Sequence, residues 1–332
     1  MARFTIGALP FIISPAGVAK CFVALSAWQL HGHLRDREQF NAFCSALMPR
    51  VIAYGDGQRL VLFCSRVNGE MGRILVRHNM TLPPVRAFHR MLRRLLQSEA
   101  YQQRVIAQAE EYERWLAAFL ASPYGPLAAR AVAYLAAWDV LPARPTYGAV
   151  GSFGAQVAGK YVPWLDACAV QMDVACAGPH AELRFIETLL HEQVHAVVAY
   201  RMGRDDCRRE LEWLHELGAI LTSQHALARA AAELGSSALR AEVRAYLALS
   251  RRTTAYGDLA EAVLRETQTP EVGWAIWSSI IALRRIPKQD YACRRVLAPL
   301  LIASGWEVRL PYRYAGGIVD ALECRPEQRW II

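Results

Sequence analysis

Residues 185–200 read Phe185-Ile-Glu-Thr-Leu-Leu-His-Glu-Gln-Val-His-Ala-Val-Val-Ala-Tyr200, with the pentad His191-Glu192-Gln193-Val194-His195 in the middle. On an α-helix, side chains four residues apart lie one above the other on the same face. The imidazoles of His191 and His195 can therefore reach one metal ion. Glu192 lies one step further round the helix, close enough to hold a water molecule beside that ion.

The flanks of the pentad predict that it is helical. Gly178 and Pro179 interrupt the chain before it, Glu182 and Glu187 fall in the early turns, and Gly203 marks the end. An H-E-x-x-H pentad on a helix is typical of zinc peptidases, but so short a pattern also occurs by chance in proteins that bind no metal. The prediction of a metal site therefore depends on the sequence downstream.

A catalytic zinc ion takes three protein ligands and keeps one position for water, so the two histidines need a third partner. A histidine six residues after the second is one option, but that position holds Arg201. The other option is a carboxylate on a following helix, which residues 209–224 predict. Glu216 lies in that segment, and the turn expected over residues 202–206 would bring it back against the first helix.

The segment Trp213-Leu214-His215-Glu216-Leu217-Gly218-Ala219 resembles the W-L-x-E-G-x-A segment of gluzincins, which are H-E-x-x-H plus Glu metallopeptidases. It departs from that pattern because its glycine comes one residue later than usual. Upstream, Ala158–Pro163 followed by Cys168–Met172 is similar to the strand pair that precedes the metal helix in the family. The resemblance covers about residues 150–225 and is specific for a zincin, not for a substrate.

The resemblance implies a zinc ion (Zn2+) held by His191, His195 and Glu216, with Glu192 as the catalytic base. Glu212, one turn before Glu216, is the rival third ligand, although an ordinary solvated helix carboxylate explains it as well. In gluzincins the substrate peptide pairs with an edge strand ahead of the metal helix. The resemblance therefore implies that residues 157–174 supply such an edge here.

The composition indicates a folded chain. It has 332 residues, of which 54% are hydrophobic and 20% charged, and this excludes a disordered protein. The formal net charge is +8, and the predicted helix over residues 85–96 gathers arginines on one side. Such a helix can meet nucleic acid, but a solvated face of an ordinary helix is the simpler interpretation.

Eight cysteines are scattered without a C-x-x-C pair, which favours free thiols in a reducing compartment. Residues 4–30 are largely apolar, but Pro10 and Pro15 interrupt them, and Lys20 stands directly before Cys21. These features favour strands and turns over a secretory signal. We therefore expect a cytoplasmic protein rather than a secreted one, and no membrane span.

The order of patterns predicts an α+β protein: an N-terminal α/β region over residues 1–145, then a zincin-like metallopeptidase domain over 146–332. Leu60–Cys64 and Arg73–Arg77 are predicted strands. Besides the pentad helix and the helix over 209–224, helices are expected over residues 85–96, 101–120, 126–138, 226–234, 239–251, 259–265 and 271–286. The zincin-like unit would consist of edge strands, the metal helix and a helical C-terminal part, and it would use some strands of the N-terminal region.

The predicted function is hydrolysis of peptide bonds in a peptide or protein substrate by one zinc ion, with Glu192 as general base. Two alternatives stay open. One is a DNA-associated protease or nucleic-acid-binding protein, and the other is a zincin-fold interaction module without catalysis. The presence of Glu192 argues against the second, because a purely structural metal site has no use for a general base.

Overall fold

The structure is a computed structural model that describes residues 2–13, 97–136, 146–150, 158–162, 167–202, 212–234 and 236–253, with single residues 73, 90, 94, 257 and 260. The elements in these ranges are β1 (Ala2–Ile6), β2 (Leu9–Ile13), α5 (Glu99–Ala121), α6 (Tyr124–Ala136), β3 (Thr146–Ala149), β4 (Gly159–Val162), β5 (Ala167–Gln171), α7 (Met172–Ala175), α8 (Ala181–Met202), α9 (Glu212–Glu233) and α10 (Ser237–Thr253). In this part of the chain, no helix combines the length and the apolar character needed to cross a membrane.

The chain divides into two compact units. One comprises Met1–Pro126 and Pro142–Phe185, and the other comprises Leu127–Leu141 and Ile186–Ile332. The first unit contains all the described strands, and the second is helical where it is described. Strands from both sides of the predicted domain boundary between residues 145 and 146 join one sheet, and that boundary stays a prediction.

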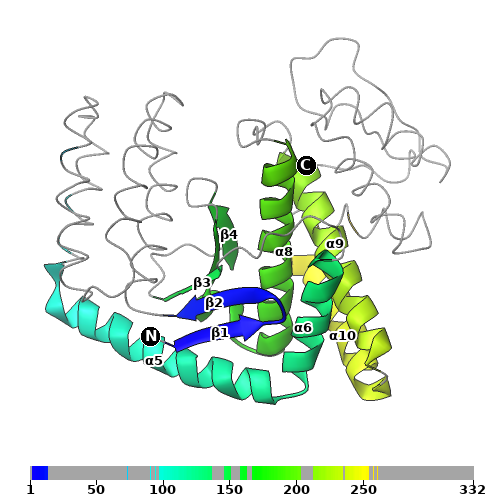
Figure 1. The fold of residues 1–332 in the computed structure, drawn as a ribbon, viewed down its shortest axis with the longest axis horizontal. Helices are drawn as coiled ribbons and strands as arrows, with labels where there is room; N and C mark the ends of the chain where they lie inside the picture. Colours follow the sequence, from blue (N-terminus) through cyan, green and yellow to red (C-terminus); the bar gives the residue numbers. More distant parts are fainter. Residues whose placement is uncertain are drawn as a thin grey trace, which may run out of the picture. The chain divides into compact units, whose positions relative to one another are not determined.

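Within the described residues, five strands form one mixed sheet in the order β1-β2-β3-β5-β4 (Figure 1). The β1–β2 and β4–β5 pairs are antiparallel, whereas β2–β3 and β3–β5 are parallel. Gly7, in the turn between β1 and β2, has a φ of 59°, a left-handed conformation that glycine adopts without a steric penalty. The described protein is therefore a mixed α/β fold, and β4 is the last strand on one side of the sheet.

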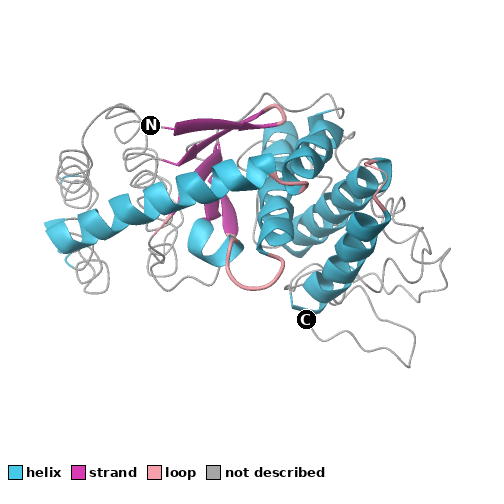
Figure 2. Ribbon diagram, turned by 90° about the horizontal axis from the view of Figure 1, so that it is seen from below, coloured by secondary structure: helices cyan, strands magenta, loops and turns pink. Residues whose placement is uncertain are grey.

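An aromatic cluster forms the core of the first unit. Helix α5 runs beside the sheet and contacts β2 (Figure 2). Phe185, in the second turn of α8, packs edge-to-face against Phe11 of β2 and against Trp115 and Phe119 of α5, with ring centroids 5.2–5.4 Å apart. Phe11 and Phe185 are fully buried, and edge-to-face pairs add to the free energy gained by burying rings of this size. Phe185 is thus packed into the aromatic core of the first unit.

Most sequence predictions within the described ranges are confirmed. The N-terminal residues form strands, and α5, α6 and α10 match three of the predicted helices. The strand pair ahead of the pentad is present as β4 and β5. The prediction of a separate helix at 226–234 is wrong, because α9 continues from Glu212 to Glu233. Residues 219–233 contain no glycine or proline and are rich in alanine, so nothing in the sequence breaks the helix.

The predicted strand at Arg73–Arg77 is contradicted at Arg73, which is helical. A short apolar run fits a buried helical segment as well as a strand, so this pattern cannot decide between them. Of the predicted basic helix, Arg90 and Arg94 are described, and both are helical and exposed. The predicted strand at 60–64 and the C-terminal segment after residue 260 lie outside the described residues.

Candidate metal centre

Helix α8 carries the pentad, and its sequence explains its position. It begins after Gly178 and His180, which have positive φ values of 69° and 60° and turn the chain into the helix. The Arg184 guanidinium donates a 2.5 Å hydrogen bond to the carbonyl of Ala177, which stabilises this turn. One face of α8 is apolar and fully buried. Its residues are Leu183, Phe185, Ile186, Leu189, Leu190 and Val194. Burial of that face fixes the direction in which the histidines project.

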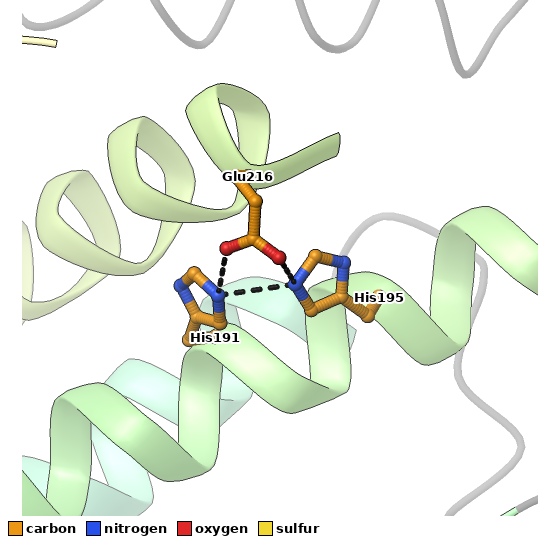
Figure 3. Close-up of side chains that lie close together, drawn as sticks. All are labelled: His191, His195 and Glu216. Atoms are coloured by element: carbon orange, nitrogen blue, oxygen red, sulfur yellow. Dashed lines mark hydrogen bonds and ion pairs between the residues drawn. The ribbon is translucent and has the colours of Figure 1, made fainter. Parts of the chain in front are cut away.

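His191 and His195 lie on neighbouring turns of α8 and point toward α9 (Figure 3). Their side chains are 17% and 16% exposed, and Glu216 of α9, at 31%, reaches both (Figure 3). The Nε2 atoms of the two imidazoles are 3.0 Å apart. One carboxylate oxygen of Glu216 lies 3.1 Å from His191 Nε2, and the other lies 3.4 Å from His195 Nε2.

These separations fit a tetrahedral metal ion. Bonds of about 2.0–2.1 Å from zinc to imidazole nitrogen or carboxylate oxygen place neighbouring ligand atoms about 3.3 Å apart. The three measured separations lie close to this value, and among the described residues this group brings two histidines and a carboxylate within 4.8 Å of one another. Two neutral nitrogens and one anionic oxygen are the donors of a catalytic zinc site with an open fourth position.

The same contacts shift the protonation of the metal-free cluster. Burial lowers the pKa of His191, but the hydrogen bond to Glu216 and the charges of Glu216, Glu192 and Glu187 outweigh it and raise that pKa to about 9. For Glu216, burial raises the pKa, but the hydrogen bonds from His191 and His195 outweigh burial and hold that pKa far below its ordinary value. Near neutral pH an imidazolium therefore donates to Glu216, and a bound cation would replace this proton.

Glu192 lies on α8 next to His191, is 6% exposed, and contributes to the electrostatic field on His191. The structure thus brings together the three predicted ligands and buries the predicted base beside them. Glu212, the rival ligand, is the first residue of α9, and its side chain lies outside what the structure describes.

The sequence did not predict a polar network that begins on the same helix. Glu187, one turn before His191, accepts hydrogen bonds from Tyr246, Ser250 and Gln224. From the sequence it is only an acidic residue in an early helical turn. The available signal was its position four residues before His191, which places both side chains on one face of the helix.

Comparison of the chain with protein-family models, with curated proteins and with solved structures found no match.

Proposed function

We propose that this protein is a zinc-dependent metallopeptidase of the gluzincin type. The observation that carries the proposal is the convergence of His191, His195 and Glu216, with ligand-atom separations of 3.0–3.4 Å. The H-E-x-x-H spacing and the Trp213–Ala219 segment support it separately, because both are features of the sequence and do not depend on the geometry. We propose His191, His195 and Glu216 as the zinc ligands, and Glu216 rather than Glu212 as the third.

Zinc bound at this position would lower the pKa of a water molecule and polarise the carbonyl of the scissile bond. Glu192 then acts as the general base, which takes a proton from the attacking water and passes it to the leaving amine. With one anionic carboxylate and two neutral imidazoles as ligands, a bound zinc ion would keep a net positive charge, which would help to polarise a carbonyl.

The fold is compatible with a zincin-like arrangement. A strand pair, β4 and β5, comes shortly before the metal helix, and helices follow it, in the order expected for a zincin-like unit. We therefore propose a zincin-like metallopeptidase domain within residues 146–332, with a peptide or protein as substrate. We expect the protein to be cytoplasmic. Among the described residues, Cys168 and Cys176 are not joined in a disulfide, which is usual in a reducing compartment.

A DNA-associated protease or nucleic-acid-binding protein is the second candidate. The net charge of +8 and the exposed Arg90 and Arg94 favour it, because arginines spaced one turn apart can contact successive phosphates. Binding of a DNA duplex that weakens steeply with salt concentration would support this candidate. Binding too weak to detect at about 50 mM salt would exclude it.

The Glu192→Gln variant tests the proposed function against a non-catalytic interaction module. Glutamine keeps the size and the hydrogen bonding of the side chain but lacks the basic oxygen. Zinc content and melting temperature should stay at the parent values, while hydrolysis of a substrate selected from a peptide library falls by about 10²- to 10⁴-fold. If the variant cleaves that substrate as fast as the parent, Glu192 is not the base, and a parent with no cleavage at all supports the interaction module.

A further inference from the structure

Glu187 lies at the junction of three helices. It projects from α8 and is partly buried. One of its carboxylate oxygens accepts hydrogen bonds of 2.5 Å from the Tyr246 hydroxyl and 2.7 Å from the Ser250 hydroxyl, both on α10. The other oxygen accepts a 2.8 Å hydrogen bond from the side-chain amide of Gln224 on α9. One carboxylate thus joins α9 and α10 to the metal helix.

The orientation of Gln224 is fixed from both ends. Its amide nitrogen donates to Glu187, and its amide oxygen accepts a 2.8 Å hydrogen bond from the guanidinium of Arg251 on α10. Gln224 is 3% exposed, Tyr246 3% and Ser250 7%, so these groups cannot exchange partners freely with water. Directional bonds between buried groups allow few alternative arrangements, and they therefore fix how α9 and α10 lie against α8.

The network lies directly beside the candidate metal centre. Glu187 and His191 are four residues apart on α8 and share one face. On α9, Gln224 and Glu216 lie on the same helix, and each makes a side-chain contact with α8. These two contacts together limit how far α9 can slide along α8 or rotate against it.

We propose that Glu187 is a positioning residue of the metal centre: through Gln224, Tyr246 and Ser250 it fixes α9 against α8 and so holds the Glu216 carboxylate opposite His191 and His195. This inference rests on the proposed zinc site. An apolar side chain at 187 would pack the same helices without specifying their register, because apolar contacts are not directional. A carboxylate with three donors specifies one register, and Glu216 reaches the imidazoles only in a register close to it.

The test compares Glu187→Ala with the matched change Glu182→Ala, which removes the other glutamate from the early turns of α8. Both purified variants and the parent are titrated with Co2+, whose visible absorption reports the geometry and the number of its ligands. Glu187→Ala should bind Co2+ about 10- to 100-fold more weakly, the range for residues that orient metal ligands. Its spectrum should shift toward that of Glu216→Ala, while Glu182→Ala keeps the affinity and the spectrum of the parent.

A double variant separates positioning from a general loss of stability. If Glu187 acts through Glu216, adding Glu187→Ala to Glu216→Ala should cost no further Co2+ affinity. Losses that add would contradict the proposal, as would a folded Glu187→Ala protein with the affinity and spectrum of the parent. If circular dichroism shows that Glu187→Ala is unfolded, Tyr246→Phe replaces it, with an expected several-fold loss of affinity. An unchanged Tyr246→Phe would then overturn the positioning role.

The outcomes distinguish this inference from the proposed function. A parent protein that takes up neither Co2+ nor Zn2+ would refute the metal centre itself, and with it the positioning role. A parent that binds Co2+ together with an unaffected Glu187→Ala variant would refute only the role of Glu187.

Discussion

Two carboxylates lie on the contact between α8 and α9, and their partners differ. Glu216 faces two imidazole nitrogens, whereas Glu187 faces two hydroxyls and an amide. An imidazole can release its proton and become a metal ligand, but a neutral hydroxyl or amide N–H that donates to a carboxylate has no comparable capacity. The partners of each carboxylate, rather than its charge, therefore distinguish the candidate metal centre from the structural junction one turn away.

The largest expected effect comes from removing an imidazole. His195→Ala leaves one nitrogen and one carboxylate, which is too few ligands for a catalytic zinc site. Zinc affinity should fall by more than the roughly 100-fold that marks the upper range for residues outside the ligand set. Competition with a chromophoric chelator measures this loss. If His195→Ala binds zinc as tightly as the parent, His195 is not a zinc ligand.

The next effect separates the two candidate carboxylates on α9. Glu216→Ala should lose most of its bound zinc, because Glu216 is the carboxylate that contacts both imidazoles. Glu212→Ala, the matched change one turn earlier, should keep the zinc content of the parent. Elemental analysis of both purified proteins measures the difference. Equal zinc content in Glu216→Ala and the parent would mean that another residue is the third ligand.

The pKa of His191 predicts how zinc affinity depends on pH. Zinc needs the neutral imidazole, and the pKa of His191 in the metal-free cluster is raised to about 9. Below that pH, binding must release the proton, so affinity should increase as the pH rises toward 9 and level off above it. The slope should approach about tenfold per pH unit near neutrality. Calorimetric titrations in buffers of different ionisation enthalpy would count the released proton, and no release at pH 7 would contradict the shift.

The smallest effect concerns the junction at Glu187. Ser250→Ala removes one of its three donors, and a hydrogen bond to a charged group contributes about 1.5–3 kcal/mol to the free energy of unfolding. Thr253→Ala, at the exposed end of the same helix, should change it by no more than about 0.5 kcal/mol. Urea unfolding of both variants measures these values. Equal stabilities would mean that the junction contributes no more than an exposed helix end.

The sequence predicted the three candidate ligands because their placement follows local rules. The spacing of His191 and His195 is a property of one helix, and Glu216 needed only a second helix and a turn. The partners of Glu187 are 37, 59 and 63 residues away, and no periodicity encodes such distances. In the sequence, Tyr246 and Ser250 look like ordinary helix residues, and only the packing of α10 brings them to Glu187. The network therefore depends on tertiary packing, which the chain pattern does not specify.

The fold was predictable to a similar degree. An apolar run interrupted by prolines indicated the N-terminal strands, and the resemblance to gluzincins indicated β4 and β5. Helical patterns and their flanking residues indicated α5, α6, α8 and α10. The parallel pairing of β2 with β3 was not predicted, because those strands are separated by more than a hundred residues and register is set by contacts across the sheet. The helical state of Arg73 shows the same limit, since an apolar run of a few residues fits either structure.

X-ray absorption at the zinc edge of the purified protein tests the central claim most directly. The account predicts one zinc ion per chain with nitrogen and oxygen ligands at about 2.0–2.1 Å and the scattering pattern of two imidazoles. Glu216→Ala should change the light-atom ligands, whereas Glu192→Gln should leave the spectrum unchanged. Sulfur scattering at about 2.3 Å, or a zinc spectrum that is the same in the parent and in His191→Ala, would show that the metal binds elsewhere and contradict the account.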